Sequence, residues 1–163
     1  MKKFFLFVFV GLLSLNLIGQ NKPASPKMET ENSLMKITYG APSKKDRVIF
    51  GGLVPYDAVW RTGANEATEV TFKKDVKVGG KSVKAGTYTL FTIPTASDWT
   101  IILNSELKQW GAFGYDKVKD KNVAEVKVPS MKANDEAELF TISTTDGGFD
   151  MMWDKTKVSV PVK

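Results

Sequence analysis

The stretch Val76-Lys77-Val78-Gly79-Gly80-Lys81-Ser82-Val83 decides the fold class. Two short runs that alternate valine with polar residues flank a Gly-Gly pair. Such a pair supplies the positive φ angles that a tight two-residue turn between antiparallel strands requires. The stretch therefore predicts a β-hairpin.

The segments on both sides of this hairpin also follow the two-residue period of strands. Residues 68–72 alternate apolar and polar side chains. Residues 87–93 are apolar or threonine on both faces, which is typical of a central strand, and Pro94 ends the run. Further strands are predicted at 35–39, 99–103, 124–128, 139–143, 149–153 and 158–162. About eight or nine strands with glycine-rich turns and no amphipathic helix predict an all-β protein, an antiparallel β-sandwich or small barrel.

The N-terminal part predicts export. Residues 1–19 begin with two lysines, continue as an uncharged apolar run and end at the small residue Gly19, the order found in a cleavable signal peptide. Residues 20–32 hold prolines and charges and predict a flexible leader. Residues 33–163 then form a single β-sandwich domain. We expect a periplasmic or secreted protein that does not span the membrane after signal cleavage.

Composition excludes several kinds of chemistry. The 163 residues contain no histidine and no cysteine. Ser-His-Asp and Cys-His catalysis and ordinary zinc sites are therefore excluded, and no metal or cofactor is predicted. The net charge of +5 is mild and comes from many lysines, so nucleic acid is not an expected partner.

The densest polar cluster lies in residues 60–68. Arg61 is one of only two arginines, with Arg47, and its planar guanidinium can hold a carboxylate or sugar hydroxyls through two hydrogen bonds. Trp60 offers a flat face, and Asn65 and Glu66 offer polar groups, so the cluster predicts a site for a small polar ligand. The alternative is structural: Arg61 pairs with Glu66 inside the fold, Trp60 belongs to the core, and Asn65 serves a turn.

A second candidate is the long segment 109–116, in which aromatic residues alternate with glycine. Trp110 and Tyr115 could stack on a glycan or a peptide, since loops on rigid β scaffolds often carry function. The alternative is a loop held on the sheet by its own aromatic side chains.

Five segments resemble the bacterial domain-of-unknown-function family 2911. They are residues 49–56, 59–68, 84–94, 99–104 and 109–112, and the similarity runs from about Met35 to the C-terminus. The string from Trp60 to Thr68 is its most specific part. The resemblance implies an exported, β-rich protein of the Gram-negative envelope and no assigned activity.

Three hypotheses for the function follow. The first is a periplasmic module that binds a small polar ligand, a glycan or peptide, through Arg61, Asn65 and Glu66, with Trp60 or Trp110 as the stacking face. The second is a glycosidase-type hydrolase that pairs Glu66 with an aspartate. That mechanism needs two carboxyl groups about 5 Å or about 6.5–9.5 Å apart. The third is an envelope scaffold without a small-molecule site.

Overall fold

The structure, a computed structural model, describes residues 25–163. The predicted signal peptide and residues 20–24 of the predicted leader lie outside the described residues. The described chain forms strands β1 (Lys27–Glu31), β2 (Met35–Gly40), β3 (Thr68–Phe72), β4 (Val76–Val78), β5 (Lys81–Val83), β6 (Gly86–Pro94), β7 (Asp98–Asn104), β8 (Asn122–Thr145) and β9 (Gly148–Pro161). Two single-turn 3₁₀ helices, η1 (Tyr115–Lys117) and η2 (Lys119–Lys121), precede β8. The predicted all-β class is confirmed.

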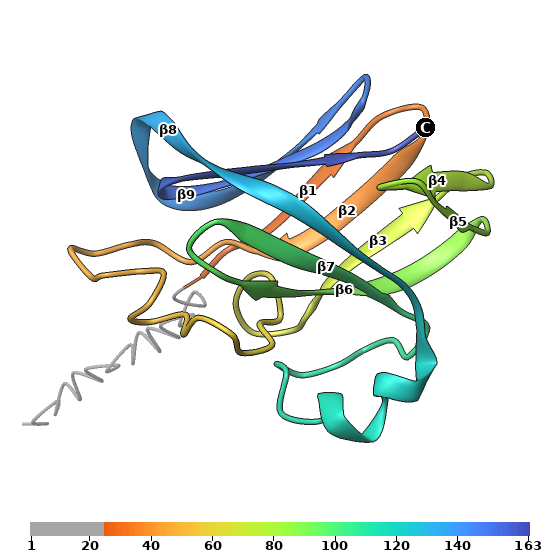
Figure 1. Cartoon of the computed structure of the whole chain (residues 1–163), viewed down its shortest axis with the longest axis horizontal. Helices are drawn as coiled ribbons and strands as arrows, with labels where there is room; N and C mark the ends of the chain where they lie inside the picture. Colours follow the sequence, from red (N-terminus) through yellow and green to blue (C-terminus); the bar gives the residue numbers. More distant parts are fainter. Residues whose placement is uncertain (1–24) are drawn as a thin grey trace, which may run out of the picture.

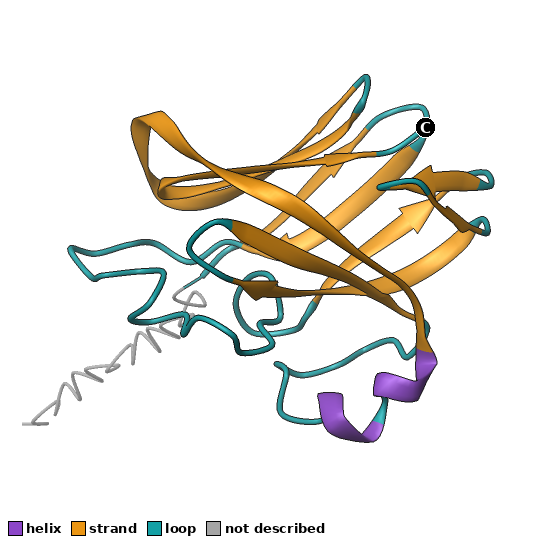
Figure 2. Ribbon diagram, viewed as in Figure 1, coloured by secondary structure: helices purple, strands orange, loops and turns teal. Residues whose placement is uncertain are grey.

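Seven strands form one antiparallel sheet in the order β1-β2-β3-β6-β7-β8-β9 (Figures 1 and 2). The predicted hairpin is the separate pair β4-β5, and its turn residues Gly79 and Gly80 have φ angles of 52° and 88°. The hairpin adjoins the C-terminal end of β9, where the Lys77 amide donates to the Lys163 carbonyl at 2.7 Å. The stretch 87–93 is confirmed as part of a central strand, because β6 lies between β3 and β7.

The large sheet curls back on itself through β8. The first part of this 24-residue strand pairs with β7, the later part pairs with β9, and the register shifts between Lys132 and Thr141. Such irregularities bend a strand and increase its twist. The far part of β8 thereby returns to β1, where the Thr30 and Thr144 hydroxyls hydrogen bond at 3.1 Å. The strands predicted at 124–128 and 139–143 are thus two parts of one bent strand.

The strand β1 corrects the predicted leader. Lys27–Glu31 pairs with β2 along its whole length, and the leader therefore ends before residue 27. Its side chains are mostly exposed, so no apolar alternation marks it in the sequence. Backbone pairing holds it in place, helped by the ion pairs Lys36–Glu29 and Lys73–Glu31, both at 2.7 Å.

The core lies inside the curl. Its largest members are aromatic: Trp99, Trp153 and Phe140 are at most 2% exposed, and Trp60 and Phe50 pack against them. A smaller cluster on the other side of the sheet contains Ala67, Phe91 and Ile102, and Tyr115 packs on it. No helix within residues 25–163 has the length and hydrophobicity needed to cross a membrane.

Candidate functional site

A cleft of about 550 Å³ opens between the loop that follows β2 and the loop that follows β7. It brings together three of the predicted residues, Trp60, Arg61 and Asn65. Two cationic residues, Lys45 and Arg47, and two apolar residues, Leu53 and Phe113, also line it.

The segment from Trp60 to Thr68 is held as a tight loop by its own polar groups. The Trp60 amide and carbonyl pair with Thr92 of β6 at 2.7 and 2.9 Å. The Trp60 indole nitrogen donates to the Gly63 carbonyl at 3.1 Å, and the Thr68 hydroxyl donates to the Thr62 carbonyl at 2.6 Å. These contacts position Arg61, which lines the cleft and whose Nε donates to the Gly63 carbonyl at 3.3 Å.

Two residues of this loop have left-handed backbone conformations. Asn65 has a φ of 63°, which asparagine tolerates, and its carbonyl accepts a hydrogen bond from the Gly111 amide at 3.2 Å. Thr62 has a φ of 56°, which is unfavourable for a β-branched residue, and it is completely buried. Strain of this kind persists only where surrounding contacts enforce it, and it occurs preferentially at functional sites. The turn role considered for Asn65 is confirmed.

Trp60 serves both the core and the cleft. Its ring stacks on Trp153, with 6.0 Å between centroids and 16° between planes, and meets Phe140 edge-on at 5.1 Å. The core role considered for this side chain is therefore confirmed. The half-buried Trp60 also lines the cleft, and the buried Trp153 supports its ring from below.

Arg61 and Glu66 do not form the buried pair that the structural alternative required. Among the ion pairs of residues 25–163, none joins these two side chains, and Glu66 is exposed. Glu66 instead lines a second hollow of about 310 Å³, together with Glu69, Lys27 and Lys108. The structure thus separates Glu66 from the cleft that contains Arg61.

The loop after β7 approaches the same region. Glu66 and Trp110 form an isolated antiparallel bridge, and the Ala67 amide donates to the Gln109 carbonyl at 2.8 Å. Trp110 is 64% exposed but does not line the cleft, whereas Phe113, which is 86% exposed, does.

Tyr115 packs against the sheet and has a structural role. Its ring meets Phe91 edge-on at 5.2 Å, and its hydroxyl accepts a hydrogen bond from the Asn122 amide group at 2.7 Å. The alternative in which aromatic side chains hold the loop on the sheet thus describes this residue. Within the predicted segment, the cleft receives Phe113 in place of Trp110 and Tyr115.

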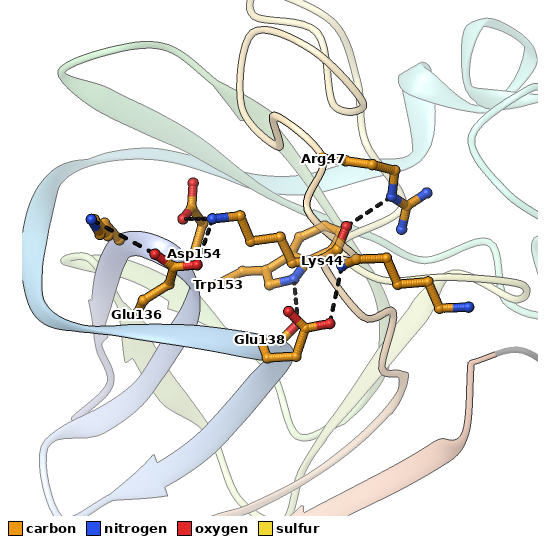
Figure 3. A network of polar contacts seen from close by, with 8 residues as sticks. Lys44, Arg47, Glu136, Glu138, Trp153 and Asp154 are labelled. Atoms are coloured by element: carbon orange, nitrogen blue, oxygen red, sulfur yellow. Dashed lines mark hydrogen bonds and ion pairs between the residues drawn. The ribbon is translucent and has the colours of Figure 1, made fainter.

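Lys45 and Arg47 also line the cleft, and polar contacts of the neighbouring Lys44 hold this part of the loop in place (Figure 3). The Lys44 amide donates to the Glu138 carbonyl at 2.7 Å, and the Lys44 ammonium binds Asp154 at 2.7 Å and Glu136 at 2.6 Å. Hydrogen bonds to these two carboxylates raise the pKa of Lys44, and the same ammonium lowers the pKa of Glu136. Lys44 therefore attaches this part of the loop to β8 and β9, and its neighbours Lys45 and Arg47 line the cleft.

Arg47 is itself oriented by backbone carbonyls. Its Nε donates to the Lys44 carbonyl at 2.9 Å and its Nη2 to the Ser43 carbonyl at 2.6 Å (Figure 3 shows the first). Three cations, Lys45, Arg47 and Arg61, consequently line one cleft, and no carboxylate is among the described residues that line it. Asp46 lies in the same turn, but its side chain is not part of the lining.

This arrangement suits an anion. Guanidinium groups stay charged at all physiological pH values and bind carboxylate or phosphate groups through paired hydrogen bonds. No ion pair within residues 25–163 involves any of the three cations. The same part of the chain also holds no group of three acidic side chains placed to bind a metal ion.

Sequence reasoning missed Lys45, Arg47, Leu53 and Phe113 as site residues. The rarity of arginine was the available signal, because both arginines of the chain line the cleft. Lys45 had no such signal among the many lysines. Its proximity to Arg61 depends on the turn at residues 45–46, whose φ angles of 49° and 56° the sequence does not specify.

Glu66→Gln and Arg61→Ala should each change the free energy of unfolding by less than about 1 kcal/mol. Loss of one member of a buried pair would cost about 3–5 kcal/mol, but these side chains form no such pair. Glu66 is exposed, and the half-buried Arg61 makes one long hydrogen bond, from its Nε to the Gly63 carbonyl at 3.3 Å, so both losses should be small. Urea unfolding followed by circular dichroism measures the difference. A loss above about 3 kcal/mol in both variants would restore the structural interpretation of the cluster.

A family model described as a protein of unknown function (DUF2911) matches residues 22–162. Comparison with curated proteins and with solved structures found no match.

Proposed function

The chain belongs to the DUF2911 family, whose function is unknown, and we propose that it is an exported module that binds a small anionic ligand in the cleft between its two long loops. One observation carries the proposal: both arginines and Lys45 line a cleft to which no described carboxylate contributes. Cations gathered in this way attract and retain an anion. The export signal read from residues 1–19 supports a site of action outside the cytoplasm.

The shape of the site favours a ring or a short chain that bears the anionic group. Trp60, supported from below by the buried Trp153, offers an aromatic surface on which a sugar or another flat group can stack, and Asn65 lines the same cleft. An acidic sugar or a phosphate ester combines the two features. This ligand class is narrower than the small polar ligand expected from the sequence, because three cations in one cleft favour a ligand that carries negative charge.

Binding is favoured over glycoside hydrolysis in this cleft. Hydrolysis needs a pair of carboxyl groups on either side of the bond to be cleaved, and the cleft lining of the described chain has no carboxylate. Glu66 lies in the separate hollow with Glu69. A hydrolase that uses Glu66 would therefore work away from the arginines.

Matched pairs of charged and neutral probes test the proposal. In titration calorimetry, glucuronate should bind and glucose should not, and glycerol 3-phosphate should bind where glycerol does not. Arg61→Gln should weaken binding of the charged probes by about 10- to 100-fold, because it removes a charge-assisted hydrogen bond. Lys81→Gln, which removes the same charge from the distant β4-β5 turn, is the control and should bind as the wild type does.

Two outcomes contradict the proposal. Equal affinity for the charged and neutral members of each pair would mean that the cations do not recognise the ligand. Equal weakening by Arg61→Gln and Lys81→Gln would mean that only the overall charge matters.

A further inference from the structure

The rim of the cleft is unusually apolar for a region so open to solvent. Phe113 is 86% exposed and Leu53 is 46% exposed, and both line the cleft. They come from two different loops, Leu53 from the loop after β2 and Phe113 from the loop after β7. In Figure 1 both loops lie on the lower side of the molecule, away from the C-terminus.

More apolar side chains from the same two loops are exposed. Of the eight large apolar side chains that are exposed within residues 25–163, five come from these loops: Val48, Leu53, Tyr56, Trp110 and Phe113. Val48 is 73% exposed and its carbonyl accepts the Leu53 amide at 3.0 Å, so these two lie in one turn. Of these five, Leu53 and Phe113 line the cleft. Single exposed apolar residues need no explanation, but several from two adjoining loops are typical of an interaction surface.

Phe113 lies close to one of the three cations. Gly111 lies next to both the apolar Phe113 and the cationic Arg61: a Cβ added there would lie 2.9 Å from the Phe113 ring and 3.2 Å from Arg61 Nη1. Lys45 and Arg47, which also line the cleft, are exposed and adjoin the exposed Val48 in sequence. An apolar edge with cations immediately behind it is complementary to a layer in which anionic headgroups cover acyl chains.

We propose that this face docks on an anionic lipid surface, with Phe113 and Leu53 inserted between headgroups and Lys45, Arg47 and Arg61 bound to the phosphate of one lipid. The inference rests on the proposed function, since it names a membrane lipid as the source of the anion. Aromatic side chains are favoured at the depth where headgroups meet acyl chains. The cations supply selectivity for anionic over zwitterionic lipid.

Co-sedimentation with lipid vesicles tests the docking. The protein is purified from the exported fraction of expressing cells, so that every variant has the same N-terminus. The protein should bind strongly to vesicles that contain phosphatidylglycerol. Its binding to vesicles of phosphatidylcholine alone should be weaker by about tenfold or more. The double variant Phe113→Ser/Leu53→Ser should lose about tenfold or more in partitioning to the anionic vesicles.

Met131→Ser is the matched control. Met131 is 47% exposed, lies on β8 and does not line the cleft, so its loss should change partitioning by less than about twofold. Phe113 and Leu53 are also exposed, and circular dichroism should therefore find both variants folded. Equal partitioning of the double variant and the control would overturn the docking, and so would equal binding to neutral vesicles.

Titration of the same samples with glycerol 3-phosphate separates the two proposals. If this soluble probe binds in an Arg61-dependent manner while phosphatidylglycerol vesicles do not bind, the lipid inference is wrong and the proposed function stands. If neither binds, both are wrong. If the vesicles bind through Phe113 and Leu53 and glycerol 3-phosphate competes, both are supported.

Discussion

Trp153→Ala is expected to lower the free energy of unfolding by about 3–5 kcal/mol, the range for removal of a large aromatic side chain from a core. The side chain is 1% exposed, and the centroid of its ring lies about 6 Å from the ring centroids of Trp60, Phe140 and Phe50. Its indole nitrogen also donates to the Glu138 carbonyl at 3.2 Å. The substitution would thus leave a cavity in the aromatic cluster and a carbonyl without this donor.

Urea unfolding of both proteins, followed by far-ultraviolet circular dichroism, measures the effect. Domains of this size have total stabilities of about 5–15 kcal/mol, so the variant should be close to the limit of folding. Trp110→Ala removes the same indole from a site that is 64% exposed and should cost less than about 1 kcal/mol. Similar losses in the two variants would contradict the assignment of Trp153 to the centre of the core.

The stability effect of Trp153→Ala should extend to the cleft. Trp60 rests on Trp153 and carries the Gly63 contact that closes the loop around Arg61. A cavity below Trp60 lets that ring tilt, and Arg61 moves with it. We therefore expect weaker binding of glucuronate even under conditions where the variant is folded.

The strands could be predicted because their local signals agree with the sheet. Residues 68–72 alternate apolar and polar side chains and become β3 with the predicted face buried. The Gly79-Gly80 pair predicted the turn between β4 and β5, since the required positive φ angles depend on those two residues alone. Patterns of this kind are local and need no information from the rest of the chain.

Features that depend on distant contacts could not be predicted. The strand β1 has exposed side chains on both faces, and only pairing with β2 makes it a strand. The continuity of β8 depends on β7 and β9, which pair with its two parts on either side of a bend. The short apolar runs at 124–128 and 139–143 marked these two parts but gave no sign of the bend that joins them.

The candidate site was predicted only in part, because the positions of its side chains also depend on distant contacts. Residues 60–66 are close in sequence, so their proximity was expected, but the direction of each side chain was not. Arg61 and Glu66 line different hollows, and two residues between them, Thr62 and Asn65, have left-handed backbone conformations that the sequence pattern did not specify. The convergence of Arg47 with Arg61 is a property of the fold: 14 positions separate them in sequence, and the anchoring of Lys44 to Asp154 and Glu136 holds the loop between them in place.

Gly40→Ala should disturb the loop that carries Arg61. Gly40 ends β2, and a Cβ at this position would lie 2.1 Å from the Ala64 carbonyl oxygen. The two backbones are also joined by a hydrogen bond from the Ala64 amide to the Gly40 carbonyl at 3.1 Å. Because the clash is with backbone, no side-chain rotation can relieve it, and the loop from Arg61 to Asn65 must move.

We expect a loss of about 1–3 kcal/mol in the free energy of unfolding, the usual cost of overpacking. The affinity for glucuronate should fall by about tenfold, because displacement of Ala64 shifts Arg61 away from the other cations. Both quantities can be measured on one preparation, by urea unfolding and by titration calorimetry. Binding is the more informative of the two, since it reports on the position of the loop.

Gly147→Ala is the matched control for this substitution. Gly147 lies between β8 and β9, and a Cβ there would meet no atom within 4 Å. The same chemical change should therefore leave stability and binding close to those of the wild type. If Gly40→Ala also unfolds and binds as the wild type does, the contact between β2 and Ala64 does not position Arg61. If stability falls while binding is unchanged, the contact supports the fold alone, and the orientation of Arg61 must come from the contacts of Trp60 and Thr68.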